Sequence, residues 1–383
     1  MYSKSMIVAA QPEAAEAGAR VLMAGGNAVD AAVTAALVQG AVDPQMCGIA
    51  GFGNCQLLLP DQDIHTCIDF HGKTPLAASP KMWEDLIISE TRDGFGFVLK
   101  DNVNDLGYQS VTTPGSLKAY YEALENFGTW DWSDVVAPAI KHAEQGFIVR
   151  PHVAFWWNYG ANYGRVGVDE RLRYSKTGAE SYFDSSGNLK KIGDKVKISG
   201  MAETLKKIAK YGPDIFYKGE IAEKISEDMK KNGGLLSYED LSTYSTKWTD
   251  PLVGKYRDFG ISTNHPPGGG IMLLEMLNIL ENFNLSKLGH NSKEYIRVVC
   301  EAMKQATVDK ESFVGDPDFV NVPIRRLLSK KHARQCSKHI LSGQKINIDR
   351  IGQFESKDTT HVSVVDKHGN CVTMTHSLGM PSG

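Results

Sequence analysis

Hydroxyl side chains gather near the end of the chain in two short alternating segments. The segments cover residues 359–365 and 371–378, with a five-residue loop, 366–370, between them. Alternation on both sides of a short polar loop predicts an antiparallel β-hairpin. Pairing Val365 with Cys371 gathers the polar side chains on one face and places Ser377 directly across from Thr359. That face carries Thr359, His361, Ser363, Thr373, Thr375 and Ser377.

The opposite face fixes this register because it is mostly apolar. It carries Val362, Val364, Val372, Met374 and Leu378, with Thr360 and His376 as polar exceptions. A four-residue loop would set the polar side chains of one strand against the apolar side chains of the other. A buried face forbids such a shift.

A cluster of hydroxyls with an imidazole suggests a nucleophile. A threonine hydroxyl is a poor nucleophile without a neighbouring base, and the sequence identifies no Ser-His-Asp set here. The chemistry that fits is a threonine whose own α-amino group, freed by cleavage of the preceding bond, is the general base. The alternative is structural, because threonine favours strands and a hairpin solvated on one side shows the same pattern. The residues alone leave both interpretations open.

Three other motifs do not indicate a cofactor. The glycines in 48–53 follow a predicted helix rather than a strand, which does not fit a dinucleotide fingerprint. The glycines at 268–270 lack the Lys-Ser/Thr pair of a phosphate loop. His65, Asp69 and His71 have no recognised metal-ligand spacing. We therefore expect neither a cofactor nor a metal.

The elements that position the hairpin begin near the N-terminus. Pro12 predicts the start of a helix that Gly25-Gly26 ends, and Asn27 predicts the cap of a second, buried helix running to about residue 38. Further segments are predicted as strands at 56–59, 65–70 and within 253–263, and as helices from 113, at 133–144, within 199–234, and at 271–283 and 293–308. No repeat or low-complexity linker marks a domain boundary.

Composition excludes several classes of protein. The chain has 383 residues, a formal net charge of −3 and 42% apolar residues, with no long run of like charge, so we expect no nucleic-acid partner. Polar residues interrupt the most apolar stretch, 28–52, and we expect no membrane span. The apolar run 6–10 is too short for a signal peptide, which predicts a cytoplasmic protein. The six cysteines form no CxxC pair, which favours reduced thiols.

The sequence resembles the gamma-glutamyltransferase (gamma-glutamyltranspeptidase) family of N-terminal-nucleophile (Ntn) hydrolases. Matching stretches occur in order from about residue 8 to 378 and include AAQPEAAEAGARVLMAGGNAVDAAVTAALV, TTPGSLKAYYEAL, HPPGGGIMLLEMLNILENF and DTTHVSVVDKHGNCVTMTHSLG. The resemblance implies an α+β fold, a four-layer αββα sandwich, and a precursor that cleaves itself between Asp358 and Thr359. Residues 1–358 would form the large-subunit region and 359–383 the start of the small-subunit region, assembled as a heterodimer.

The resemblance also implies roles for individual residues. Thr359 would be the nucleophile of both self-cleavage and turnover, and Thr360 matches the second threonine of the family's pair. Ser377 matches a position where the family often has a threonine whose hydroxyl assists the nucleophile. The expected substrate is a small gamma-glutamyl or other acyl amide, with water or an amino acid as the acceptor and no cofactor.

Two departures from the family pattern concern the substrate. His71 stands where relatives hold the γ-glutamyl α-carboxylate with an arginine, and Gly379 where many have an asparagine that contacts the same amino acid. An arginine offers a permanently charged fork that histidine does not reproduce. Two rival functions are therefore an acylase of the cephalosporin or glutaryl type on the same scaffold, and an unprocessed, non-catalytic binding protein.

The length after Thr359 also departs from the family. Only residues 359–383 follow the expected cleavage point, whereas a family small subunit is much longer and supplies the glycine pair of the oxyanion hole. We expect the sequence to represent part of a longer precursor. A chain that truly ended at residue 383 would be inactive.

Overall fold

The computed structural model describes residues 4–91, 96–158, 165–348 and 359–379. The chain divides into two compact units, one formed by Met1–Trp248 with Gly352–Gly383 and the other by Thr249–Ile351. The sequence alone shows no clean boundary at this point. The first break falls between Trp248 and Thr249, and no change in composition marks it.

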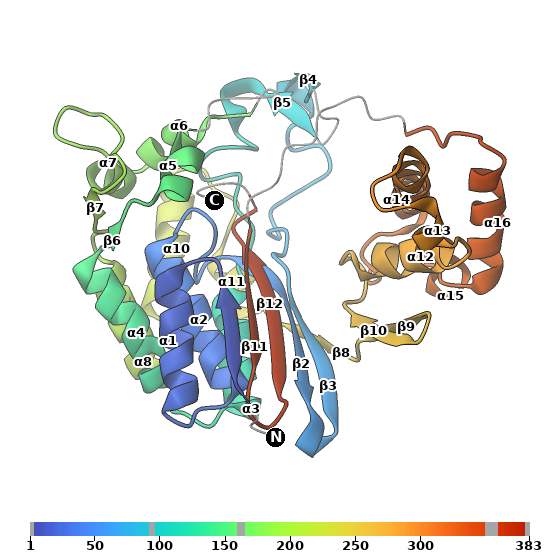
Figure 1. Cartoon of the computed structure of the whole chain (residues 1–383). Coiled ribbons are helices and arrows are strands. Elements are labelled where there is room, and N and C mark those ends of the chain that lie inside the picture. Colours follow the sequence, from blue (N-terminus) through green and yellow to red (C-terminus); the bar gives the residue numbers. More distant parts are fainter. Residues whose placement is uncertain (1–3, 92–95, 159–164, 349–358, 380–383) are drawn as a thin grey trace. The chain divides into compact units, whose positions relative to one another are not determined.

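A six-stranded sheet organises the first unit. Its order is β1-β11-β12-β2-β3-β8, so the strands from the end of the sequence lie between strands from its beginning, as Figure 1 shows in red and blue. The neighbouring pairs from β1 to β3 are antiparallel. The strands are β1 (Met6–Ala9), β2 (Phe52–Leu59), β3 (Ile64–Phe70), β8 (Lys247–Thr249), β11 (Thr360–Val365) and β12 (Cys371–Ser377).

Helices α1 (Pro12–Met23) and α2 (Ala28–Val42) form the hairpin that the sequence predicted. Asn27 caps α2 through a capping box with Asp30, which satisfies backbone N–H groups at the helix start. Every residue of α2 except Gly40 is buried, and the helix packs against β11 and β12 (Figure 1). This layer carries the core of the unit and holds one face of the C-terminal hairpin.

The remaining helices of the first unit cover 116–242. The predicted helices near 113, 133 and 199–234 are confirmed, whereas the helices between 151 and 182 were not predicted. They are α3 (Ser116–Phe127), α4 (Trp132–Gln145), α5 (Pro151–Trp157), α6 (Val168–Tyr174), α7 (Lys176–Tyr182), α8 (Met201–Tyr211), α9 (Asp214–Tyr217), α10 (Glu220–Lys231) and α11 (Tyr238–Ser242). Two small ribbons pair β4 (Ile87–Glu90) with β5 (Phe97–Leu99) and β6 (Phe147–Ile148) with β7 (Lys195–Val196).

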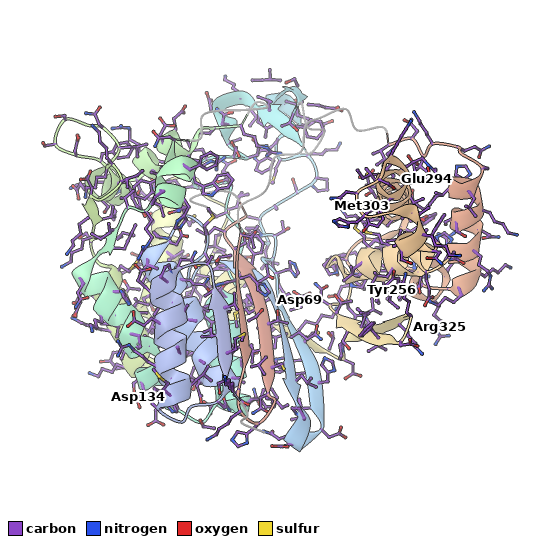
Figure 2. All side chains as sticks on the ribbon, viewed as in Figure 1. Asp69, Asp134, Tyr256, Glu294, Met303 and Arg325 are labelled. Carbon is purple, nitrogen blue, oxygen red and sulfur yellow. The ribbon has the colours of Figure 1, made fainter. Side chains whose placement is uncertain are left out.

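The second unit is mainly helical. It contains the ribbon of β9 (Leu252–Tyr256) and β10 (Phe259–Thr263), and the helices α12 (Gly270–Leu280), α13 (Leu285–Leu288), α14 (Lys293–Phe313), α15 (Ile324–Leu327) and α16 (Lys330–Leu341). Helices α12, α14 and α16 pack on one another, and their core includes Ile279, Val298 and Ile340. Figure 2 labels Glu294 and Met303 on α14.

The described chain is thus an α+β protein. None of its described helices is both long and apolar enough to cross a membrane. All six cysteines are free thiols.

Candidate active site

The C-terminal hairpin has the predicted register. Val365 pairs with Cys371, Ser363 with Thr373, and His361 with Thr375. The next pair, Thr360 with His376, brings the start of β11 beside the end of β12. The predicted loop at 366–370 is therefore confirmed, as are the two faces of the hairpin.

Asp366 explains why the loop closes where it does. One carboxylate oxygen accepts hydrogen bonds from the backbone N–H groups of His368 and Asn370, at 2.8 and 3.1 Å. The other oxygen accepts the backbone N–H of Ala28, at 3.0 Å, in the first turn of α2. Because a carboxylate is favoured at a helix N-terminus, Asp366 ties the hairpin to α2. Gly369 adopts a φ of 81°, which glycine accommodates without strain.

Thr359 and Ser377 meet at the open end of the hairpin. Thr359 is exposed, and its Oγ1 donates a hydrogen bond to Oγ of the buried Ser377, at 3.2 Å. The backbone N–H of Gly379 also donates to Ser377 Oγ, at 2.9 Å, which fixes the serine rotamer. Asp358, the other residue of the expected cleavage point, lies outside the described residues.

Thr360 faces the opposite way, into the core beneath Thr359. Its hydroxyl accepts a hydrogen bond from Gln39 Nε2 at 2.8 Å, and it also contacts Gln11 Oε1 at 3.4 Å. Gln39 Nε2 donates to Gln11 Oε1 at 2.6 Å, and Gln11 Nε2 donates to Asp43 at 2.6 Å. This buried amide network anchors the residue directly after Thr359 to α2.

His376 extends the same network on the other strand. Its Nε2 lies 2.9 Å from Gln39 Oε1, and its Nδ1 is hydrogen-bonded to the Tyr120 hydroxyl. Burial lowers the pKa of His376 to about 3, so the ring is neutral. Because Gln39 Oε1 can only accept, Nε2 carries the hydrogen and Nδ1 accepts from Tyr120. A neutral, fully satisfied histidine is suited to holding the strand ends rather than to moving protons.

His361 lies on the exposed polar face. Its ring nitrogens contact the hydroxyls of Thr375, Ser363 and Thr373, at 2.7 to 2.9 Å. Partial burial lowers the pKa of His361. The ring therefore links hydroxyls across the two strands, which agrees with a structural role.

The two residues predicted to contact substrate lie around one aromatic ring. Phe52 pairs with Ser377 in the sheet, and its ring stacks on His71 with the ring centroids 6.4 Å apart. Gly379 has a φ of 92°, and a side chain added there would approach the Phe52 ring to 3.3 Å. The structure thus gathers His71, Ser377 and Gly379 about Phe52.

His71 forms an ion pair with Asp69, a residue labelled on β3 in Figure 2. Burial alone would raise the pKa of Asp69, but the hydrogen bond and charge of His71 hold this pKa below its usual value. The Lys73 ammonium lies 5.1 Å from the centre of the Tyr244 ring. An imidazole beside a carboxylate is a weaker anchor for a substrate carboxylate than a free arginine.

Sequence reasoning did not find Gln39, Gln11 or Tyr120. Gln39 and His376 are 337 residues apart in the sequence, and no local pattern links them. The available signal was polarity, because Gln39 interrupts an otherwise apolar helix and His376 is an exception on an apolar face. Among the described residues, no group of three potential metal ligands lies near Thr359.

Comparisons with known proteins agree on the family to which the chain is similar. The gamma-glutamyltranspeptidase family model matches residues 14–383. The chain is 35% identical to the glutathione hydrolase proenzyme of Escherichia coli over 99% of its length and 63% of the relative's. It is also 35% identical to the acylase ACY 1 proenzyme of Pseudomonas sp. strain SE83, over 98% of the chain and 65% of the relative. The chain therefore spans less than two thirds of these relatives.

Solved structures agree with the sequence matches. The chain resembles the gamma-glutamyltranspeptidase of Helicobacter pylori with a TM-score of 0.77 and 32% identity, over 90% of this chain and 92% of that one. It resembles the cephalosporin acylase of Bacillus halodurans with a TM-score of 0.81 and 26% identity, over 100% of this chain and 67% of that one. Both kinds of relative share the fold of this chain.

Proposed function

The chain belongs to the gamma-glutamyltranspeptidase family, and from this premise we propose that it is a self-processing Ntn hydrolase with Thr359 as the nucleophile. The observation that carries the proposal is the 3.2 Å hydrogen bond between the hydroxyls of Thr359 and Ser377 at the open end of the hairpin. The proposed boundary divides a large-subunit region, 1–358, from a small-subunit region that starts at 359 and assembles with it as a heterodimer.

Processing uses the Thr359 hydroxyl against its own backbone. Oγ1 attacks the carbonyl carbon of Asp358, the C–N bond of that peptide breaks, and the threonine nitrogen takes up a proton. Water then hydrolyses the resulting ester, which leaves a carboxylate on Asp358 and a free α-amino group on Thr359. That amino group is the base that a threonine nucleophile otherwise lacks.

Turnover repeats the attack on a substrate amide. The Thr359 α-amino group accepts the hydroxyl proton while Oγ1 bonds to the acyl carbon, and the proton passes to the leaving amine. Water or an amino acid then attacks the acyl-Thr359 ester and releases the acid or a new amide. Ser377 orients the attacking oxygen, and Thr360 holds the backbone through Gln39.

The open face of the sheet supports the four-layer αββα arrangement. On β1, the side chains of Met6 and Val8 are 65% and 60% exposed, while α2 covers the opposite face of β11 and β12. Neighbouring exposed apolar side chains at this edge of the sheet would gain stability from a covering layer. We therefore propose that a second sheet packs on this face.

Ser377→Ala is expected to lower kcat by about 10²-fold while leaving the fold intact, because it removes one oriented hydroxyl at the reacting oxygen. Ser363→Ala, on the same polar face, is the matched control and should keep its rate. Steady-state kinetics and thermal melting measure the two effects. An unchanged kcat in Ser377→Ala would refute the assigned role.

The substrate class follows from the residues around Phe52. Glutaryl and γ-glutamyl groups share a terminal carboxylate, and only the γ-glutamyl group carries an α-amino group beside it. Gly379 offers no side chain to that amino group, and Asp69 already pairs with His71. These residues would hold the substrate carboxylate only loosely and would give an α-amino group no side-chain partner at Gly379. A glutaryl-type acylase is accordingly the second candidate function.

Rates on γ-glutamyl-anilide and glutaryl-anilide distinguish the two enzymes. A higher kcat/KM on γ-glutamyl-anilide supports the transpeptidase, and a higher value on glutaryl-anilide supports the acylase. If the protein turns over neither substrate and its intact mass shows one uncleaved chain, the protein is an unprocessed, non-catalytic binding protein.

His71→Arg is expected to lower the KM for γ-glutamyl-anilide about tenfold, because a guanidinium forms a bidentate, permanently charged pair with a carboxylate. His65→Arg, within β3, the strand that ends just before His71, provides the control for added charge. Initial rates over a range of substrate concentrations separate KM from kcat. An equal fall in KM for both variants would show that general charge, not position, is responsible.

A further inference from the structure

A second group of reactive side chains lies in the helical unit. It combines Glu275 on α12, Asp309 on α14, and His332 and Cys336 on α16. His332 Nε2 lies 3.0 Å from Glu275 Oε1, 3.1 Å from Asp309 Oδ2 and 3.5 Å from Cys336 Sγ. One atom each from Asp309, His332 and Cys336 lie within 4.8 Å of one another.

The helices bring these groups together by regular geometry. His332 and Cys336 are four residues apart on α16 and therefore share one face of that helix. Both project toward α12 and α14, the two helices that pack against α16. Glu275, Asp309 and Cys336 are buried, with exposed fractions of 1%, 6% and 6%. Buried charged groups are normally paired with one another or bound to a metal ion.

One ring nitrogen, His332 Nε2, is the common partner of this cluster. Two carboxylate oxygens and a sulfur converge on the same ring nitrogen, and Nε2 carries at most one hydrogen. A cation accepts electron pairs from several such atoms at once. The donor set is therefore better matched to a metal ion than to a single proton.

We propose that Asp309, His332 and Cys336 bind one Zn²⁺, with the Glu275 carboxylate beside the His332 ring. A tetrahedral zinc with bonds of about 2.0 Å to N or O and about 2.3 Å to S has ligand atoms about 3.3 Å apart, or about 3.5 Å for an N–S pair. The spacings from His332 Nε2 to Asp309 Oδ2 and to Cys336 Sγ, 3.1 and 3.5 Å, follow this pattern. The thiolate and imidazole select zinc over Mg²⁺ or Ca²⁺, which prefer oxygen ligands.

A neighbouring amide supports the ligand orientation. Gln305 Nε2 donates to Asp309 Oδ2 at 2.7 Å, which directs the carboxylate toward His332. The ion would join α14 and α16, and its binding free energy would add to the stability of this unit. This proposal is independent of the function assigned to Thr359, because all its ligands lie in the second unit.

The alternative is an ion-pair cluster around a protonated histidine. Hydrogen bonds to Asp309, Cys336 and Glu275 raise the pKa of His332 to about 12 in the metal-free arrangement. Zinc must displace that proton, so the alternative predicts weak or no binding. Direct metal titration separates the two interpretations.

The test uses the purified protein after treatment with a chelator. With ZnCl₂ we expect one ion bound per chain by elemental analysis, and a rise in melting temperature. Tetrahedral Co²⁺ should give a thiolate-to-metal charge-transfer band. Cys336→Ser and His332→Gln should bind at least tenfold more weakly and lose these signals, whereas Cys300→Ser, at an exposed thiol on α14, should retain them.

Circular dichroism verifies that each variant is folded. If Cys336→Ser does not fold, Asp309→Asn is the replacement and should also bind at least tenfold more weakly. The proposal is overturned if the unmodified protein binds no Zn²⁺, or if folded Cys336→Ser and His332→Gln bind zinc as tightly as Cys300→Ser does.

Discussion

Thr359→Ala is expected to leave the chain uncleaved and to abolish turnover, because both reactions use the same hydroxyl. Neither of the neighbouring hydroxyl side chains can replace that of Thr359. Ser377 is buried and its Oγ already accepts the N–H of Gly379, and Thr360 points into the amide network. Intact mass spectrometry checks cleavage, and hydrolysis of an anilide substrate checks turnover. We expect the rate to fall by at least about 10⁴-fold, as for loss of other nucleophiles.

Thr359→Ser is the matched control. It keeps the hydroxyl and removes only a methyl group, so cleavage and turnover should persist at reduced rates. A Thr359→Ala protein that still divides between residues 358 and 359 would contradict the mechanism. Loss of both activities in Thr359→Ser would instead show that the methyl group, and not the hydroxyl alone, is required.

Gln39→Leu is expected to destabilise the protein by about 2–5 kcal/mol and to slow processing, since one side chain bridges both strands of the hairpin. The substitution leaves His376 Nε2 buried without its partner, and it leaves the Thr360 hydroxyl and Gln11 Oε1 only their 3.4 Å contact with each other. Each such group costs about 1–3 kcal/mol. Urea denaturation measures the stability, and the half-time of cleavage reports the position of Thr359.

Thr34→Val provides a control on the same helix. Thr34 is fully buried, and its hydroxyl has no hydrogen-bond partner among the described residues. Replacing it by an isostere loses no bond, so stability should change by less than about 1 kcal/mol or increase. If Gln39→Leu were as mild as Thr34→Val, the amide network would have no part in holding the hairpin.

The hairpin was predictable because its signal is local. Alternation with a period of two and one buried face allow a single register, and the polar loop at 366–370 fixes where the chain reverses. The buried helix α2 was predictable from residue 28 to about 38 for a similar reason, since it is apolar almost all round and Asn27 caps it; the structure extends it to Val42. Strand β1, Met6–Ala9, is too short to give such a signal and forms by pairing with β11.

The supports of the site were not predictable, because they depend on contacts between distant segments. Tyr120 and His376 are 256 residues apart, and Asp366 reaches the start of α2 across 338 residues. The cluster around His332 draws on three helices, and only the spacing of His332 and Cys336 is visible in the sequence. For Gln39 and His376, a polar residue among buried apolar neighbours was the available sign.

The boundary between the two units illustrates the same limit. Strand β8 ends at Thr249 and β9 begins at Leu252, so the chain passes from one unit to the other within a few residues. A turn of this length is common within a single domain. Only the packing of each unit around its own core reveals the division.

The most direct test of the account is the N-terminal sequence of the purified, unmodified protein, together with its intact mass. We predict two chains, and a second N-terminus that begins Thr-Thr-His-Val at residue 359 with a free α-amino group. A single chain that remains intact, or a break at any other bond, would contradict the assignment of Thr359 as a self-generated nucleophile.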